Sequence, residues 1–592
     1  MKANARQGII GVALVAATTL LTLSAQAETP AAHRLHAILA DYDAFYNRED
    51  PIGAGQRGDL AAKALWPDDS SAEEAYRHHM DLEFKRRLDA APAAALTGED
   101  ALNRQLLDAR LTIDIEGDVF DEERVPFTND EGFFVAPGYV SSDTVIHTDA
   151  EARAWLTRIA TLDRYYQTQV DNMRRGLADG FVSPRITATT AMRATREAAD
   201  LPVGQSLLLG PFDHLPPAMQ GERDALRTEA LELIRTRVKP AEVKLADFFQ
   251  TEYLPKSRES LGAADLPDGR AYYVYRVRRE TTTDMTPDEI FALGQSEIAR
   301  IRGEMAKEIA ASGFTGTFPE FLAKLRSDPQ FYVTTREALM EKASRLAKRV
   351  DGQLPAYFGK LPRLTYGVVE VPRAIEDGYT SGRYNEGSPE AGVAGKLLIN
   401  TSHLDQRPLY ELPALVSHEG APGHHIQIAL AQELTGQPLF RRDSDITAFV
   451  EGWALYAEQL TREMDLYQTP YERFGLLSME MWRACRLVMD VGIHWKGWTW
   501  DQAMACLKEN SALAEKNIQT ETDRYIGWPG QALGYKIGQL DFEKLRDKAR
   551  AALGPRFDYR SFHDEALDEG AMPLSVLETR MDAWIAEQAA KP

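Results

Sequence analysis

The sequence contains 592 residues, 44% of them hydrophobic, and carries a formal net charge of −21. This acidic balance argues against a nucleic-acid-binding protein, because phosphate recognition needs clustered lysine and arginine side chains. With only two cysteines in the chain, a cysteine-rich zinc site is excluded, so any zinc ligands must be histidines or carboxylates.

Residues 1–27 have the pattern of a secretory signal peptide. Lys2 and Arg6 precede an apolar stretch from Ile9 to Leu23, and Ala25-Gln26-Ala27 supplies the small residues of a cleavage site. A membrane anchor is the alternative interpretation, but the stretch is short for the roughly 20 residues of a spanning helix. We therefore expect export across the inner membrane to the periplasm, with no membrane span after processing.

Residues 28–350 are expected to form a mainly helical N-terminal part. Apolar residues recur at helical spacing in 151–176, 222–250 and 286–312, and Thr286-Pro287-Asp288-Glu289 is a typical helix start. We expect these helices to wall a deep cleft, packed as one lobed unit with the rest of the chain.

One segment of this part, residues 269–278, has a different pattern. Its aromatic and β-branched residues alternate with polar ones, which predicts a strand. Tyr272, Tyr273 and Tyr275 would either pack as one face of that strand, which is the simpler interpretation, or line a substrate groove.

Residues 351–592 are expected to form the catalytic part. The helical pattern lapses between 351 and 405, where Leu364 to Val371 and Lys396 to Asn400 predict strands of a small sheet, and it returns in 446–464 and 479–495. Cys485 and Cys506 fall on neighbouring helical segments. We expect them to be buried as small apolar residues, with a disulfide as the alternative in an oxidising compartment.

Three histidines and a carboxylate lie together in His418-Glu419-Gly420-Ala421-Pro422-Gly423-His424-His425. Imidazole is the commonest zinc ligand, and a Glu after a ligating His is the general base of the H-E-x-x-H metallopeptidases. In that motif the second His stands at i+4, a position that Pro422 occupies here. Shared ligation therefore requires a break at residues 421–423, for which Pro followed by Gly is suited. The pattern is H-E-x-x-H with an insertion.

The second ligand is either His424 or His425. On a straight helix His425 would lie about 10.5 Å along the axis from His418, too far for one ion. We favour His424, because a single break in the helix more easily turns its side chain toward His418. We expect His425 to support a ligand or contact substrate.

Glu451 is the candidate third ligand. It follows the paired histidines by enough residues for one helix to end and a second to return antiparallel. A carboxylate in the apolar segment 446–464 is costly to bury unpaired. A zinc ion would satisfy it; the alternative is an ion pair with Arg483 or Arg486.

Four segments carry a family resemblance: HEGAPGHHIQ at 418–427, EGWALYAEQL at 451–460, RACRLVMDVGIHWKGW at 483–498 and RYIGWPGQALGYKIG at 524–538. They resemble the bacterial domain-of-unknown-function 885 (DUF885) family, which is usually grouped with the zincin metallopeptidases of the gluzincin type. The resemblance implies a mostly α, multi-helix zincin-like fold with a small sheet at the edge of a deep cleft. It also makes Leu397-Leu398-Ile399-Asn400 our candidate for the strand that binds an extended peptide.

Further site residues lie on the two segments at 479–495 and 522–540. Arg486, Asp490 and His494 share one helix face at spacings of four. They form either a buried ion-paired seam or a functional set in which Arg486, or else Arg483, holds a substrate carboxylate and His494 stabilises an oxyanion. Tyr535, or else Tyr525, is our candidate for the donor that zinc peptidases place opposite the metal.

These residues predict an exported metallopeptidase with one Zn²⁺ per chain, acting on oligopeptides. His418, His424 and Glu451 would leave one position open, as in catalytic zinc sites. Zinc would acidify a water and polarise a peptide carbonyl, while Glu419 takes the proton and passes it to the leaving amine. The alternative is a periplasmic protein that carries zinc and binds peptides without cleaving them.

Overall fold

The computed structural model describes residues 29–129, 131–373, 376, 379–389 and 392–591. Over these residues the chain is mostly helical, with a small three-stranded sheet, as the sequence predicts. The predicted signal peptide, residues 1–27, lies outside the described residues. No helix within the described ranges is long and apolar enough to cross a membrane.

The helices before the sheet are α1 (Pro30–Glu49), α2 (Pro51–Gln56), α3 (Ser71–Asp89), α4 (Gly98–Asp118), α5 (Ala136–Asp143), α6 (Asp149–Asp179), α7 (Arg185–Asp200), α8 (Arg223–Leu233), α9 (Lys239–Phe248), α10 (Gly269–Thr281), α11 (Pro287–Ala311), α12 (Phe318–Ser327), α13 (Arg336–Asp351) and α14 (Leu354–Tyr357). The strands are β1 (Tyr366–Glu370), β2 (Gly382–Asn385) and β3 (Gly395–Ile399). The helices after them are α15 (Leu412–Glu419), α16 (His424–Gln432), α17 (Leu439–Arg442), α18 (Thr447–Glu463), α19 (Pro470–His494), α20 (Trp500–Asn510), α21 (Glu515–Gly527), α22 (Gln531–Leu553), α23 (Tyr559–Leu567) and α24 (Leu574–Ala590).

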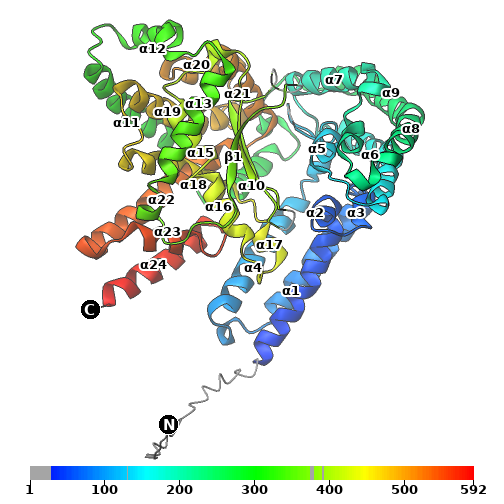
Figure 1. The fold of residues 1–592 in the computed structure, drawn as a ribbon. Helices are drawn as coiled ribbons and strands as arrows, with labels where there is room; N and C mark the ends of the chain where they lie inside the picture. Colours follow the sequence, from blue (N-terminus) through cyan, green and yellow to red (C-terminus); the bar gives the residue numbers. More distant parts are fainter. Residues whose placement is uncertain (1–28, 130, 374–375, 377–378, 390–391, 592) are drawn as a thin grey trace, which may run out of the picture.

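The helices gather on two sides of the sheet. In Figure 1, α5 to α9 lie on one side of β1, and α11, α19 and α22 to α24 lie on the other. Buried apolar residues between 127 and 254 form a core of their own. Helices α1, α3 and α4 instead share a core with the C-terminal helices. The domain boundary near residue 350 stays a prediction.

The long helices predicted from periodicity are confirmed. Residues 151–176 lie within α6, and residues 286–312 correspond to α11, which begins with a capping box between Thr286 and Glu289. Residues 222–250 contain α8 and α9, joined by the π-helical residues Ile234–Val238.

The strand predicted at 269–278 is wrong, because this segment is the helix α10. Its residues are buried on several sides, so the helical period of its apolar positions is masked. Arg276 and Glu280 form a buried ion pair at i and i+4, a contact that a helix provides and a strand does not. Tyr272 and Tyr273 are packed and hydrogen-bonded to Glu122 and Asp490, respectively.

The sheet has the order β1-β3-β2, with β1 parallel and β2 antiparallel to β3. The two predicted strands correspond to β1 and β3, and β2 was not predicted. Since β3 is paired on both sides, Leu397-Leu398-Ile399-Asn400 has no free edge. The prediction that this segment receives a peptide strand is therefore wrong, and the free edges belong to β1 and β2.

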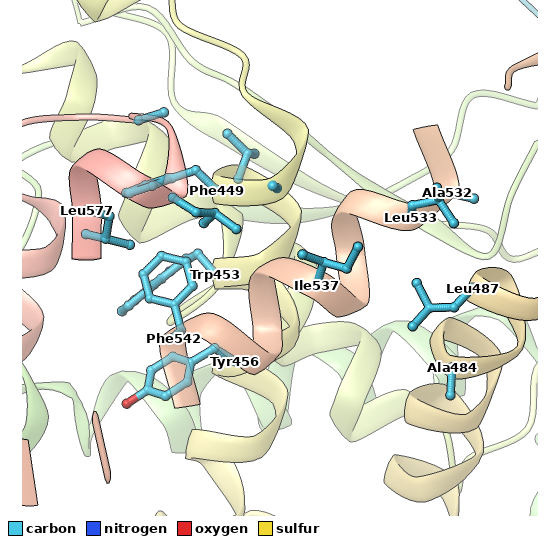
Figure 2. Packing of buried hydrophobic residues seen from close by; sticks show 14 of the residues in the cluster. Phe449, Trp453, Tyr456, Ala484, Leu487, Ala532, Leu533, Ile537, Phe542 and Leu577 are labelled. Carbon is cyan, nitrogen blue, oxygen red and sulfur yellow. The ribbon is translucent and has the colours of Figure 1, made fainter. Parts of the chain in front are cut away.

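Helices α18 and α22 pack against each other through two glycines. A Cβ on Gly538 would lie 1.8 Å from the carbonyl oxygen of Ala448, and one on Gly452 would lie 2.5 Å from the Cα of Gly538. Large side chains fill the space beside this contact, among them Phe449, Trp453 and Phe542 (Figure 2). The close approach fixes the position of α18.

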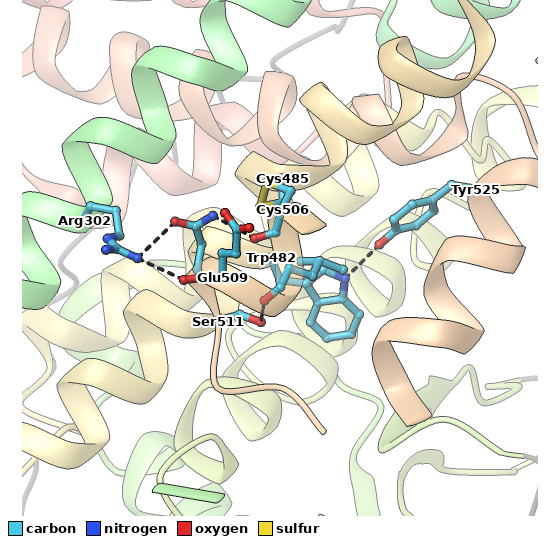
Figure 3. Close-up of a disulfide and its surroundings, with 9 residues drawn as sticks. Arg302, Trp482, Cys485, Cys506, Glu509, Ser511 and Tyr525 are labelled. Atoms are coloured by element: carbon cyan, nitrogen blue, oxygen red, sulfur yellow. Dashed lines mark hydrogen bonds between the residues drawn. A yellow bond between two sulfur atoms is a disulfide. The ribbon is translucent and has the colours of Figure 1, made fainter. Parts of the chain in front are cut away.

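A disulfide joins Cys485 on α19 to Cys506 on α20, with Cα atoms 5.8 Å apart (Figure 3). Our expectation of two unbridged, buried cysteines is thus wrong. The two helices follow each other closely, which places the Cα atoms within the range that a disulfide spans. One turn before Cys485, Trp482 donates a hydrogen bond to the hydroxyl of Tyr525.

Gly538→Ala should destabilise the protein by about 1–3 kcal/mol, because the added methyl group meets backbone in a packed core. Thermal unfolding followed by calorimetry would measure this. Gly303→Ala is the matched control, since a Cβ there has open space in an exposed part of α11. Equal unfolding temperatures for the two variants would contradict the close packing of α18 on α22.

Candidate metal centre

The predicted break in the motif is present. Helix α15 ends at Glu419 and α16 begins at His424. Gly423 donates a backbone hydrogen bond to the carbonyl of Ser417, and a Cβ on Gly423 would lie 2.0 Å from the carbonyl oxygen of His418. Trp453 of α18 donates a hydrogen bond to the carbonyl of Pro422 at 2.9 Å. The break is therefore held tightly against α18.

This arrangement brings His418, His424 and Glu451 together. The Nε2 atoms of His418 and His424 lie 3.3 and 3.5 Å from the same oxygen, Oε2 of Glu451. The three ligand atoms lie within 4.8 Å of one another. Ligands around a tetrahedral zinc with bonds of about 2.0–2.1 Å stand roughly 3.3 Å apart, so the donor set fits this ion.

The neighbouring contacts also favour a metal over internal pairing. Oε2 of Glu451 is buried without a protein hydrogen-bond partner. Arg483 and Arg486, the alternative partners of Glu451, instead lie beside Glu458 and Glu521. Burial opposes ionisation of Glu451, but His424 and His418 hold the pKa of its carboxyl well below the usual range.

His425 stands outside the cluster. Its Nδ1 lies 3.0 Å from the hydroxyl of Tyr384, and its ring packs on Tyr366. Burial lowers the pKa of His425 to about 4, although a hydrogen bond with the carbonyl of Leu364 acts in the opposite direction. Of the two candidate second ligands, the geometry brings His424 to the cluster and gives His425 a supporting place beside it.

Glu458 is a site residue that our sequence reasoning missed. Nδ1 of His418 donates to its Oε1 at 2.8 Å, the carboxylate–histidine contact that orients many metal ligands. Burial lowers the pKa of His418, but the carboxylates of Glu451 and Glu458 outweigh it and raise the pKa to about 9. The available signal was a second carboxylate two helical turns after Glu451 in the same apolar segment.

Glu419, the predicted base, points toward the sheet. Its Oε2 accepts a hydrogen bond from the backbone N–H of Tyr384 on β2 at 2.7 Å. Because β2 is an edge strand, Glu419 lies between the histidine cluster and a free strand edge.

The face of α19 with Arg486, Asp490 and His494 is buried, but the three are not paired with one another. Arg486 binds Glu521, and Asp490 accepts hydrogen bonds from Tyr273 and Gly530.

His494 uses both ring nitrogens inside the protein. Nδ1 accepts from the N–H of Ala263 and Nε2 donates to the carbonyl of Tyr525, while burial lowers the pKa of His494 to about 3. This ring has no proton left for an oxyanion, so the contacts contradict the catalytic prediction for His494. They make it a structural residue.

Two further predicted residues are also saturated by internal contacts. The hydroxyl of Tyr525 donates to Glu521 and accepts from Trp482 and Arg486. The side chain of Asn400 is fully buried, and its amide donates to backbone carbonyls while its oxygen accepts from Ser402. Neither has a polar group free for substrate, so the donor prediction for Tyr525 and the peptide-binding prediction for Asn400 are corrected.

Tyr535 keeps its hydroxyl proton available. The hydroxyl accepts hydrogen bonds from Arg524 and Gln531 at 3.3 and 3.5 Å. Its ring packs against the guanidinium of Arg486. A donor role for Tyr535 therefore stays a prediction.

Comparisons with known proteins agree on family and fold. A family model described as bacterial protein of unknown function (DUF885) matches residues 51–581. The crystal structure of a candidate lipoprotein from Colwellia psychrerythraea is 25% identical, with a TM-score of 0.88 over 95% of this chain and 100% of that one. A candidate lipoprotein of unknown function from Shewanella oneidensis is 17% identical, with a TM-score of 0.68 over 93% of this chain and 100% of the other. No curated protein matches the sequence.

Glu458→Gln should weaken zinc binding by about 10–100-fold, because the amide is a poorer acceptor for the Nδ1 proton of His418. Competition with a chromophoric chelator would measure the affinity. Glu463→Gln, at the partly exposed end of the same helix, is the control and should bind zinc like the wild type. An unchanged affinity in Glu458→Gln would remove Glu458 from the site.

Proposed function

The chain belongs to the DUF885 family of bacterial proteins, and we propose that it is a zinc-dependent, zincin-like metallopeptidase that hydrolyses oligopeptides. The observation that carries the proposal is the convergence of His418, His424 and Glu451 on one point, with Glu419 next to the first histidine in the chain. Three protein ligands of this kind are typical of catalytic zinc sites, which keep one position open.

The residues of the site would divide the chemistry as follows. A zinc ion, when bound, supplies a Lewis acid that polarises a peptide carbonyl and acidifies water. Glu419 would accept a proton from the attacking water and deliver it to the leaving amine. Glu458 would hold the ring of His418 in its ligating orientation. Tyr535 is our candidate donor to the developing oxyanion.

The substrate would run along the free edge of β2. Ser381 accepts from Asn400 toward β3, and because strand residues alternate in direction, Gly382 and Tyr384 face the free edge. A peptide carbonyl there can accept a hydrogen bond from the N–H of Tyr384. In the free protein, Glu419 accepts that hydrogen bond. Strand addition would thus release the carboxylate of Glu419 at the moment the substrate arrives.

Export to the periplasm is part of the proposal. The first 27 residues have the pattern of a secretory signal peptide. The similar chains from Colwellia psychrerythraea and Shewanella oneidensis are described as candidate lipoproteins, a class of exported protein.

The second candidate is a periplasmic peptide-binding protein that carries zinc without turnover. The observation in its favour is the hydrogen bond that Glu419 accepts from the N–H of Tyr384, which occupies a carboxylate oxygen that would otherwise take a proton from water. Both candidates hold the same metal and the same peptide, so turnover distinguishes them.

Glu419→Gln should retain one zinc per chain and lose peptide cleavage by a factor of at least about 10³, because the base is removed while the ligands remain. Zinc content by atomic emission and cleavage of a mixed peptide library by mass spectrometry would test this beside the wild type. Zinc in both proteins with cleavage in neither would favour the binding protein. Absence of zinc from both would overturn the ligand assignment.

A peptide substrate that is N-methylated near the scissile bond should be cleaved at least about tenfold more slowly, because it cannot complete a ladder of backbone hydrogen bonds with β2. The comparison is the kcat/KM of the same peptide without the methyl group. Methylation far from the scissile bond is the control. Equal rates for all three peptides would exclude strand addition.

A further inference from the structure

Arg483 on α19 is a buried arginine with no role in the chemistry above. It is only 4% exposed, and its Cζ lies 4.5 Å from the ring centroid of Trp482. Its Nη1 donates to the carbonyl of Met479 on the preceding turn, and its Nε is buried without a hydrogen-bond partner. A buried guanidinium is costly unless an opposite charge compensates it. The position of Arg483 therefore depends on the carboxylates around it.

One of these carboxylates is that of Glu458, which orients a candidate zinc ligand. Nη2 of Arg483 lies 3.7 Å from Oε1 of Glu458, and the same oxygen lies 2.8 Å from Nδ1 of His418. Glu458 is 1% exposed, and within the described part of the chain Arg483 is the Arg or Lys that comes within ion-pair distance of it. One oxygen atom thus meets both the guanidinium and the imidazole.

A second carboxylate near Arg483 is that of Glu411, at the start of α15. Its Oε1 is buried without a hydrogen-bond partner. Burial raises the pKa of Glu411 to about 7, and Arg483 is the group that opposes this rise most. Glu411 and His418 stand seven residues apart, which is close to two helical turns, so they share one face of α15. Carboxylates from two helices, α15 and α18, therefore compensate the one guanidinium.

The charge of Arg483 matters most when a metal is bound. A histidine that ligates a metal is a neutral imidazole, so His418 would then offer Glu458 a hydrogen bond but no charge. The ion would bind Glu451 directly, whereas the imidazole ring separates it from Glu458. A buried carboxylate needs an opposite charge as well as a hydrogen bond. Among the described residues, the guanidinium of Arg483 is placed to supply it.

We propose that Arg483 is a positioning residue of the metal centre, which holds Glu458 where its carboxylate orients the ring of His418. The inference rests on the proposed function, because it assumes that His418 ligates zinc. It also replaces the alternative in which Arg483 holds a substrate carboxylate. A side chain this deeply buried, with its charge directed to Glu458, is not available to a substrate.

The test is a double-mutant cycle on zinc affinity, measured by competition with a chromophoric chelator, so it does not depend on turnover. Arg483→Met should weaken zinc binding about tenfold, because Glu458 loses the charge that holds it. In the Glu458→Gln background the same substitution should change the affinity less than about twofold. A merely structural role for Arg483 would lower the affinity equally in both backgrounds.

Two further variants complete the test. Arg483→Lys keeps the charge and should recover the affinity to within about threefold of the wild type, because the contact with Glu458 is not bidentate. Arg441→Met removes a fully buried arginine that binds Glu569 instead, and should bind zinc like the wild type. Thermal unfolding would show that each variant is folded.

The outcomes separate this inference from the proposed function. Equal losses in both backgrounds, or an unchanged affinity in Arg483→Met, would overturn the role of Arg483 while zinc binding by the wild type stands. A wild-type protein that binds no zinc would overturn the proposed function and this inference together.

Discussion

The carboxylate of Glu451, held between two imidazoles inside the protein, is the contact on which the rest of the site depends. A buried carboxylate without a partner is costly, and its position is set by α18. That helix is fixed on one side by the close approach of Gly452 to Gly538 on α22. On the other side, Trp453 holds the carbonyl of Pro422 in the break between α15 and α16. One helix thus positions both the third candidate ligand and the turn that presents the second.

The small sheet connects this helical framework to the proposed substrate path. Strand β3 is central and β2 lies at the edge, so the backbone of β2 faces the end of α15. The N–H of Tyr384 holds Glu419, and its hydroxyl holds His425. A single strand residue therefore contacts both the candidate base and the histidine that stands outside the metal cluster. In the proposed strand addition, a peptide at this edge would replace Glu419 as the acceptor for the N–H of Tyr384.

Local chemistry made part of the site predictable. His418, His424 and Glu451 are identified by residue type and spacing, and the break by a Pro-Gly pair in an otherwise helical motif. Long amphipathic helices such as α6 follow from periodicity. The sequence could not show that residues 269–278 are helical, because burial on several sides removes the period. The sequence also did not predict β2, because this short strand is defined by its pairing with β3, which is a long-range contact. His494, Tyr525 and Asn400 have the right chemistry, but partners distant in the sequence saturate their polar atoms.

A proton on His418 and a metal ion would be stabilised by the same two carboxylates at this centre. Glu451 and Glu458 flank His418, and the Arg or Lys nearest to Glu458 among the described side chains is Arg483, at 3.7 Å. Without a metal, His418 compensates these carboxylates by holding its proton, which is why its pKa is raised despite burial. A divalent cation at the point between the two Nε2 atoms would supply that charge and displace the proton. The carboxylates of Glu451 and Glu458, which raise the pKa of His418 in the metal-free site, are therefore also the groups that would favour a zinc ion there.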